Sequence, residues 1–379
     1  MRDRESSILC LHQAAELYGS DRSFLSAVQA LAEDGRALDV ILPDEGPLAD
    51  ELRRVPGLGL SFYDKGILRK RELQRPLAFI WRLLLGVLFY LRTFAAYRVI
   101  YINTVVMFSA LVAACVYRFS SRRIVCHVRE IPGRRQLQVF RLLFRLSGVE
   151  LIYNSEATRE AFGLAGQVIY NGVAAAESFV PGEHPAPVDR PLHLLLIGRI
   201  NQWKGQDFFV EALGQLSAEQ VKCLNVRIVG SPFEGYEYLV DALTARINEL
   251  GLVGTVDMLS FCADPSPHYR WADYVVVPSI QPEPFGRVAI EAFAYGKPVI
   301  AAAHGGLLEI VEPGRSGLLF EAASVPALAQ VLAEVLEMSA DEYAALSHNA
   351  LRRFESQFSL PGYKANIRAF FFGELQACA

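Results

Sequence analysis

The stretch LLLIGRINQWKGQDF (194–208) decides how the second half of this chain folds. An apolar run ends at Gly198, a turn carrying Arg199 and Lys204 follows, and a helical pattern opens after Gly205. A strand, a cationic turn and a helix N-terminus together form an anion site, because side-chain charge and backbone N–H groups point the same way. The sequence therefore predicts an anion-binding loop at a strand end, the alternative being a solvated loop with ordinary basic residues.

Short apolar runs alternate with helical patterns on both sides of this loop. That spacing predicts βαβ units and parallel sheets covered on both faces. We expect an α/β protein with two Rossmann-like, doubly wound parallel-sheet domains, whose active site is a cleft at the strand ends. The apolar runs lie at 7–13, 37–43, 97–103, 122–128, 150–155, 192–198, 225–230, 256–261, 274–279, 297–303 and 316–320.

The segment 174–191 interrupts this alternation with four prolines and no apolar periodicity, which indicates an interdomain connection. We expect an N-terminal domain over 1–180 and a C-terminal domain over 181–358. A final helix over 359–379 is expected to pack back on the N-terminal domain.

The composition excludes several classes of protein. A length of 379 residues suits two to three domains at about 150 residues each. A net charge of -4 and a pI near 6.0 argue against a general nucleic-acid binder. The six cysteines are scattered without C-x-x-C pairs, which indicates reduced thiols rather than a metal or redox site. With no apolar leader pattern at the start, we expect a cytoplasmic protein.

Two carboxylates with seven residues between them stand near another strand end. Glu283 lies between two prolines after the run 274–279, and Glu291 lies in the helix that follows. Taken singly, one could be a solvated turn acid and the other a helix-dipole partner. The next strand ends at the glycine pair 305–306, which lets backbone approach a ligand closely. Three consecutive strand ends thus predict one pocket.

Taken together, these motifs resemble a known family. GRINQWKGQ (198–206) and EPFGRVAIEAFAYGKPVIAAAHGGLLEIVEPGRSGLL (283–319) resemble the nucleotide-sugar half of retaining glycosyltransferases of family 4, also called glycosyltransferase group 1. CHVREIPG (126–133), IYNSEATRE (152–160) and VIYNGV (168–173) continue the resemblance in the first half. The resemblance implies the GT-B fold, two Rossmann-like domains facing each other across a cleft.

The resemblance implies a hexosyltransferase. It would move a hexosyl unit from a nucleotide-diphosphate sugar to a hydroxyl of a glycan or lipid-linked acceptor, in bacterial cell-surface polysaccharide or lipopolysaccharide biosynthesis. No cofactor and no metal are expected. The alternatives are another GT-B enzyme, such as a sugar phosphorylase or nucleotide-sugar epimerase, or a nucleotide-sugar-binding scaffold without turnover. A dinucleotide oxidoreductase would need G-x-G-x-x-G, which neither glycine loop supplies.

Donor-side roles follow from the same resemblance. Arg199 and Lys204 would hold the donor diphosphate and stabilise the charge that develops as it leaves. Glu283 would contact hydroxyls of the transferred sugar, and Glu291 the ribose. Further donor contacts are expected from the backbone around Phe285, Gly286 and Arg287.

In the first domain the resemblance assigns His127 to the sugar or the incoming hydroxyl. The alternative is a strand-end histidine satisfied by its own hydrogen bonds. Arg129 and Glu130 are candidates for the acceptor side. Family members often carry two adjacent glycines in the loop after the first strand, where backbone N–H groups approach the donor phosphates. This chain has Gly19 alone, and the resemblance implies the same donor contact for it. The pattern over 18–35 predicts a helix there, with residue 20 or 21 as its N-cap.

Two carboxylates in a retaining enzyme also suggest a nucleophile for two inverting steps. If Glu283 and Glu291 bind the sugar and the ribose, no placed nucleophile remains. We therefore expect front-face attack, with the leaving phosphate accepting the acceptor's proton, and with Arg199 and Lys204 neutralising charge in place of a metal.

The segment 65–98 has eight basic residues and one acid, interleaved with apolar residues. It predicts a basic amphipathic helix and peripheral contact with an anionic membrane, at the inner face of the cytoplasmic membrane. The alternative is a core helix with a solvated basic face. Neither 77–91 nor 105–117 is expected to span a bilayer, and no nucleic-acid partner is expected.

Overall fold

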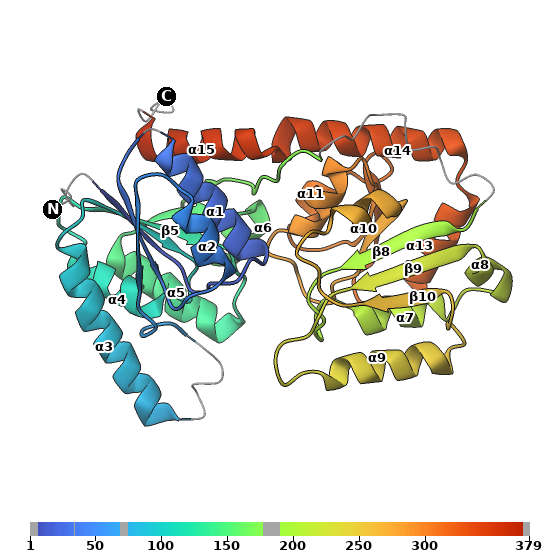
Figure 1. Ribbon diagram of the computed structural model, residues 1–379, viewed down its shortest axis with the longest axis horizontal. Coiled ribbons are helices and arrows are strands. Elements are labelled where there is room, and N and C mark those ends of the chain that lie inside the picture. The colour runs from blue at the N-terminus through green and yellow to red at the C-terminus, as the bar shows by residue number, and fades with distance from the viewer. Residues whose placement is uncertain (1–6, 34, 69–74, 177–189, 374–379) are drawn as a thin grey trace. The chain divides into compact units, whose positions relative to one another are not determined.

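A computed structural model describes residues 7–33, 35–68, 75–176 and 190–373 (Figure 1). The chain divides into two compact units. Unit 1 comprises Met1–Gly172 and Leu360–Ala379, and unit 2 comprises Val173–Ser359. The sequence placed the two boundaries at 180 and 358. Most of the expected connection, residues 177–189, lies outside the described residues.

Unit 1 is built on a seven-stranded sheet with the order β3-β2-β1-β4-β5-β6-β7, and every pair of neighbouring strands is parallel. The order reverses at β1, as a doubly wound sheet requires. The strands are β1 (Ile8–Leu11), β2 (Leu38–Leu42), β3 (Leu58–Phe62), β4 (Val99–Asn103), β5 (Arg123–Val128), β6 (Glu150–Tyr153) and β7 (Gln167–Val168).

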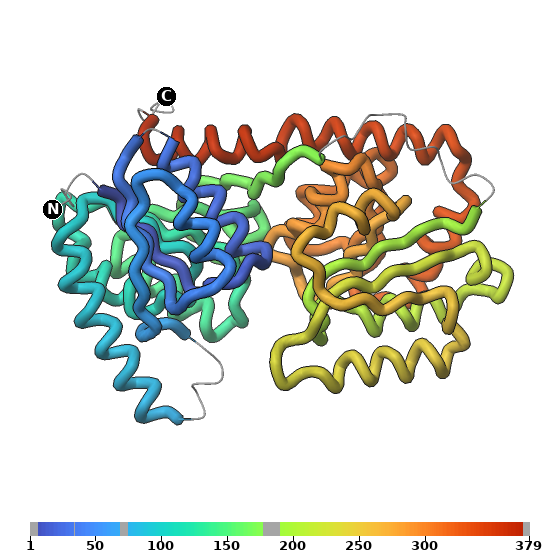
Figure 2. Tube along the Cα trace, in the orientation of Figure 1, coloured from blue at the N-terminus to red at the C-terminus, as the bar shows by residue number. Residues whose placement is uncertain are grey.

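Helices cover both faces of this sheet. One apolar cluster joins the sheet to α1, α2 and the chain-terminal α15, and a second joins it to α3, α4 and α5. Figure 2 shows α15 returning beside α1, and the two helices contact each other. The unit 1 helices are α1 (Gly19–Ala32), α2 (Pro47–Arg53), α3 (Pro76–Phe94), α4 (Phe108–Val116), α5 (Arg134–Ser147), α6 (Glu156–Phe162) and α15 (Leu360–Phe372).

Unit 2 has a six-stranded parallel sheet with the order β10-β9-β8-β11-β12-β13. Its strands are β8 (Leu192–Ile197), β9 (Leu224–Val229), β10 (Val256–Leu259), β11 (Tyr274–Val277), β12 (Val299–Ala302) and β13 (Gly317–Phe320). Its helices are α7 (Gln206–Leu213), α8 (Ala218–Lys222), α9 (Tyr238–Glu249), α10 (Ser266–Trp271), α11 (Arg287–Ala294), α12 (Leu307–Ile310), α13 (Val325–Glu337) and α14 (Ala340–Arg353), followed by a π-helical turn at Phe354–Phe358.

The central strands have the composition that this architecture demands. Strands β1 and β11 are buried at every position, because helices cover both faces of a parallel sheet. Their sequences are therefore continuous apolar runs rather than alternating ones. The prediction of two doubly wound parallel sheets is confirmed.

Two local predictions were wrong, and one strand was missed. Helix α1 begins at Gly19 with Tyr18 as its N-cap, because the Asp21 carboxylate accepts the Tyr18 backbone N–H (2.9 Å) from inside the first turn. Strand β3 gave no signal, since it is a sheet-edge strand, half exposed and containing a glycine. Within the described part of 65–98, α3 has a mainly apolar exposed face rather than a basic one. The cations Arg69, Lys70 and Arg71 lie outside the described residues.

Candidate functional site

The loop after β8 is held in shape by its own residues. The Asn201 side-chain oxygen accepts the backbone N–H groups of Trp203 (3.1 Å) and Lys204 (2.9 Å). Gly205 has φ of +77°, and a Cβ there would lie 2.1 Å from the Pro278 carbonyl oxygen. Only glycine fits this position. The loop thus packs closely against the end of β11, and this contact fixes the position of the Lys204 backbone and the start of its side chain.

Lys204 and Glu283 form an ion pair at that edge. The Lys204 Nζ lies 2.6 Å from Glu283 Oε1, and the Ser279 hydroxyl donates to the same oxygen at 2.5 Å. Burial opposes ionisation of Glu283, but the Lys204 charge and these hydrogen bonds outweigh it and hold the pKa of the carboxyl below its usual range. The structure therefore brings together two residues that are 79 positions apart in the sequence.

The glycine pair 305–306 supports the Glu283 loop from behind. A Cβ on Gly305 would lie 2.4 Å from the Glu283 carbonyl oxygen, and one on Gly306 would lie 2.5 Å from that of Phe285. The Gly306 N–H also donates to the Glu283 carbonyl (2.8 Å). We expected these glycines to admit a ligand. In the structure the 283–285 backbone occupies the space that these glycines leave. The glycines therefore affect the site by letting this loop pack closely, not by contacting a ligand.

Glu291 is oriented by two neighbours. The buried Tyr269 hydroxyl donates to Oε2 (2.8 Å), and Arg287, one turn earlier in α11, donates to Oε1 (2.8 Å). Gly286, with φ of +113°, precedes this helix. A carboxylate has about four lone-pair sites, so each oxygen can accept one further hydrogen bond. Glu291 is thus a fixed acceptor rather than a mobile surface acid.

Arg199 lies at the carboxyl end of β8, with its guanidinium stacked 3.9 Å from the ring centre of Phe233. Phe233 belongs to the loop after β9, the strand next to β8. Strands β8, β9, β11 and β12 are consecutive neighbours in the sheet, so their loops meet at one edge. This edge gathers Arg199 and the Lys204–Glu283 pair.

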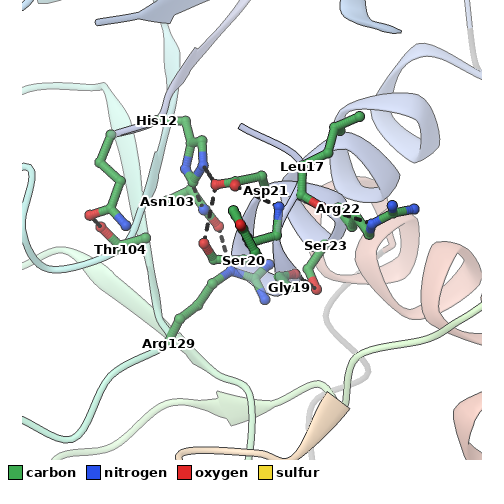
Figure 3. A network of polar contacts seen from close by, with 12 residues as sticks. His12, Leu17, Gly19, Ser20, Asp21, Arg22, Ser23, Asn103, Thr104 and Arg129 are labelled. Atoms are coloured by element: carbon green, nitrogen blue, oxygen red, sulfur yellow. Dashed lines mark hydrogen bonds and ion pairs between the residues drawn. The ribbon is translucent and has the colours of Figure 1, made fainter. Parts of the chain in front are cut away.

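The carboxyl edge of the unit 1 sheet carries a buried polar network (Figure 3). Arg129 donates from Nε to the Asn103 oxygen (2.6 Å), and the Asn103 amide nitrogen therefore faces His12 Nδ1 (2.8 Å). His12 Nε2 then donates to the Asp21 carboxylate (2.7 Å). Every donor points from the buried cation toward the buried anion, an arrangement in which each bond polarises the next.

Arg129 is the centre of this network. Besides Asn103, its guanidinium donates to the oxygen of Asn171 (2.6 Å), the Tyr363 hydroxyl (3.2 Å) and His127 Nδ1 (3.2 Å). The residue is buried. We expected Arg129 at the acceptor side, and the structure gives it contacts that organise the sheet edge.

His127 ends β5 and is fully buried. Because an arginine only donates, the contact from Arg129 makes Nδ1 an acceptor, and the neutral ring then carries its proton on Nε2. Burial, aided by the Arg129 charge, holds the pKa of His127 well below its usual range. Nε2 has no hydrogen-bond partner among the described residues. His127 is thus placed as a neutral donor.

Glu130 and Thr104 lie beside this histidine. The Glu130 carboxylate accepts the backbone N–H groups of Val105 (3.4 Å) and Arg129 (3.3 Å), and burial raises its pKa to about 7. Thr104 has φ of +80° and donates its backbone N–H to the His127 carbonyl (2.9 Å). Such strain in a β-branched residue persists only where the surroundings enforce it, and it is common at functional edges.

Sequence reasoning missed His12, Asp21 and Asn103 as members of this edge. A signal existed for His12 and Asn103, because each is the polar residue that ends or follows an apolar strand run. Asp21 lies inside a helix, and no local pattern indicates that it pairs with a residue nine positions earlier. Gly19 lies at the start of α1, and Ser155 caps α6 by accepting the Thr158 N–H (3.0 Å).

Comparison with known families shows which proteins this chain resembles. Residues 183–353 match the family model described as glycosyl transferases group 1. A D-inositol 3-phosphate glycosyltransferase of Catenulispora acidiphila is 37% identical over 166 residues, which is 41% of this chain and 40% of that protein. The protein of that name from Mycolicibacterium smegmatis is 35% identical over 204 residues, 51% of this chain and 44% of its own length. The chain spans less than half of these relatives.

Solved structures match over nearly the whole chain. HepE of Anabaena, crystallised with UDP and glucose, superposes with a TM-score of 0.77 at 26% identity, covering 97% of this chain and 99% of that one. A sucrose-phosphate synthase of Thermosynechococcus elongatus, with a TM-score of 0.78 at 20% identity over 97% and 98% of the two chains, shares the fold. Residues 183–353 thus resemble the glycosyl transferases of group 1, and the whole chain shares with HepE a fold of two Rossmann-like domains of the GT-B type.

Proposed function

We propose that this chain is a retaining hexosyltransferase, which moves a hexosyl unit from a nucleotide-diphosphate sugar to a hydroxyl of a glycan or lipid-linked acceptor. One observation carries the proposal. The edge of the unit 2 sheet holds the partly buried Lys204–Glu283 ion pair, with Arg199 in the same loop after β8 as Lys204. A sugar diphosphate offers both chemistries that this edge can bind, anionic phosphates and neutral hydroxyls.

Each side chain has a role that its contacts support. Lys204 and Arg199 would neutralise the diphosphate, and their effect grows as negative charge develops on the leaving group. Glu283 would accept hydrogen bonds from sugar hydroxyls next to that ammonium. Glu291, fixed by Tyr269 and Arg287, would accept those of the ribose. The backbone over 285–287 would line the donor between these two acids.

Unit 1 would act on the transferred sugar and the acceptor. His127 would donate from Nε2 to a substrate oxygen, because its Nδ1 is occupied by Arg129. It would not serve as a base, since its basic nitrogen is the occupied one. Glu130 would lie on the acceptor side, Arg129 would position His127, and the Gly19 helix start would approach phosphate.

We propose a uridine diphosphate sugar as the donor, because HepE, which matches over nearly the whole chain, has been crystallised with UDP and with UDP-glucose. The proposed reaction is front-face transfer with the leaving phosphate accepting the acceptor's proton. It would use no cofactor and no metal, because Arg199 and Lys204 would neutralise the charge of the diphosphate. We propose a cytoplasmic enzyme of bacterial polysaccharide or lipopolysaccharide assembly.

The test begins with thermal stabilisation by a panel of nucleotide sugars. A donor at 100 times its dissociation constant should stabilise the fold by about 2.7 kcal/mol. The selected donor is then incubated with glycan and lipid-linked acceptors, with and without a chelator, and the anomeric configuration of the product is read by NMR. A retained configuration and chelator resistance support the proposal. An inverted product would contradict the retaining mechanism. An isomerised sugar nucleotide would instead indicate an epimerase, and release of sugar phosphate a phosphorylase.

A further inference from the structure

Helices α3 and α5 of unit 1 present apolar side chains to solvent. On α3, Leu77 is 83% exposed and Trp81 62% exposed, and the rest of this stripe is about half exposed. On α5 the exposed apolar residues follow at helical spacing. The α3 stripe is Leu77, Ile80, Trp81, Leu84 and Leu88, and the α5 stripe is Val139, Leu142 and Leu146.

The two stripes belong to one layer of the molecule. Helix α4 lies between α3 and α5: the Ser109 hydroxyl donates to the Leu83 carbonyl of α3 (2.8 Å), and Arg118, just after α4, donates to the Arg145 carbonyl of α5 (2.6 Å). All three helices pack on the same face of the sheet (Figure 1). We call the two stripes and the layer that carries them the apolar face.

The charges carried by the three helices have one sign. The sequences of α3, α4 and α5 contain no aspartate or glutamate. Arginines border the apolar residues and are exposed: Arg75, Arg92, Arg118, Arg134, Arg135 and Arg145. A second copy of the chain would bring these cations against each other, which disfavours self-association. An anionic bilayer instead satisfies both the apolar side chains and the arginines.

Helix α3 is long and apolar enough to cross a membrane by length and composition alone, with a mean hydropathy of 1.6. Its connections argue for a different placement. It joins β3 to β4, two strands of one sheet, so both of its ends must return to the same sheet. Gly86 fits closely against Gly66 and Ser109, and Tyr90 and Phe94 are buried in the core. The helix therefore lies along the surface of unit 1.

We propose that the apolar face of α3 and α5 is an interfacial membrane-binding surface, which inserts its leucines and Trp81 into the acyl boundary of an anionic bilayer while its arginines contact the headgroups. This goes beyond the transfer reaction, because vesicle binding requires neither donor nor acceptor. It also changes the nature of the contact expected from the sequence, since burial of apolar side chains supplies most of the affinity.

Co-sedimentation with vesicles tests the surface. The full chain is mixed with phosphatidylcholine vesicles with and without phosphatidylglycerol, at low and high salt. We expect binding to the anionic vesicles that high salt weakens but does not abolish. The variant Ile80→Ser/Trp81→Ser/Leu84→Ser should bind on the order of 100-fold more weakly, because three half-exposed apolar side chains are lost. Leu142→Ser/Leu146→Ser on α5 should lose about 10-fold.

The matched control is Tyr238→Ser/Val253→Ser/Leu308→Ser, which removes three exposed apolar side chains from unit 2 and should leave binding unchanged. Thermal unfolding checks that each variant folds. Trp81 gives a second measurement that needs no polar substitution: lipids brominated in the acyl chain should quench wild-type fluorescence, and Trp81→Phe should remove that quenching.

Three results would overturn the proposal. Binding that high salt abolishes, without quenching of Trp81, would mean adsorption to headgroups. Equal binding by the α3 variant and the unit 2 control would place the contact elsewhere. Failure to bind vesicles, together with a dimer in analytical ultracentrifugation that the α3 variant dissolves, would make the apolar face an interface between two copies.

Discussion

The two sheet edges differ in where their charges point. At the unit 2 edge, Lys204 and Glu283 come from short loops and keep part of their surface at the edge of the fold. At the unit 1 edge, Arg129 and Asp21 are buried and joined through His12 and Asn103. The first arrangement leaves charge available to a substrate, and the second uses charge to hold strand ends together. Removing a residue should therefore cost rate in unit 2 and stability in unit 1.

The largest expected effect is on Arg129. Arg129→Met removes a buried guanidinium that serves Asn103, Asn171, Tyr363 and His127, and it leaves the Asp21 end of the network without its cation. Unpairing a buried charge costs about 3 to 5 kcal/mol. We expect urea unfolding and hydrogen exchange at β4 and β5 to show this loss. Arg129→Lys should not restore it, because an ammonium cannot reproduce the planar fork.

Arg54→Met is the control for Arg129, because Arg54 is exposed and, among the described residues, its ion pair is a surface contact with Glu51. Its unfolding midpoint should match the wild type. Equal midpoints for the Arg54 and Arg129 variants would mean that the buried network contributes little, and the contrast between the two edges would fail.

Lys204→Ala should mainly lower kcat, whereas Arg129→Met should mainly lower stability. Removing a charge that stabilises the leaving group costs about 10²- to 10³-fold in kcat. Glu283 is left buried without its ammonium, and its pKa should rise from its lowered value. Lys204→Ala/Glu283→Gln should regain stability and remain inactive. Lys222→Ala, on an exposed surface pair with Glu219, is the control and should keep full activity. A Lys204→Ala enzyme with near-wild-type kcat would remove this lysine from the mechanism.

The two edges also differ in how well the sequence predicted them. The unit 2 residues fall in two continuous stretches, 198–206 and 283–291, where a strand end, a glycine and a charge stand within a few positions. The unit 1 network joins His12 and Asp21, which are nine positions apart, to Arg129, more than 100 positions later in the chain. Their contacts depend on the strand order β1-β4-β5, which no local pattern contains.

Parallel strands were predictable for the same local reason. Continuous apolar runs mark strands buried on both faces, such as β8 and β11, whereas the half-exposed edge strand β3 has no such run. The composition of 65–98 did not predict the apolar face of α3. The cations of 65–98 suggested a basic helix, but Arg82 is paired with Asp64 (2.8 Å), and most other cations lie beyond the helix ends.

Glu130, at the unit 1 edge, should make the stability of the fold depend on pH. In the folded protein the pKa of the Glu130 carboxyl is raised to about 7. Between the ordinary pKa of a glutamate and pH 7, the folded protein therefore keeps a proton that the unfolded chain has lost. The stability this contributes is fully present at low pH and is lost as pH rises through 7. Glu130→Gln should therefore match the wild type at pH 5 and exceed it above pH 8, by on the order of 1 to 3 kcal/mol. Urea unfolding across this range measures it, and a difference independent of pH would contradict the assignment.

The smallest expected effect concerns the aromatic ring under Arg199. Phe233 stacks on that guanidinium at 3.9 Å, an exposed cation–π contact that contributes about 0.5 to 1 kcal/mol. Phe233→Leu keeps the bulk of the side chain but loses the ring face, so donor affinity measured by calorimetry should fall about 2- to 5-fold with little change in kcat. Tyr238→Leu, which removes another exposed ring of the same aromatic group, should leave affinity unchanged. If both variants lose affinity equally, the aromatic group binds the donor directly rather than by holding Arg199.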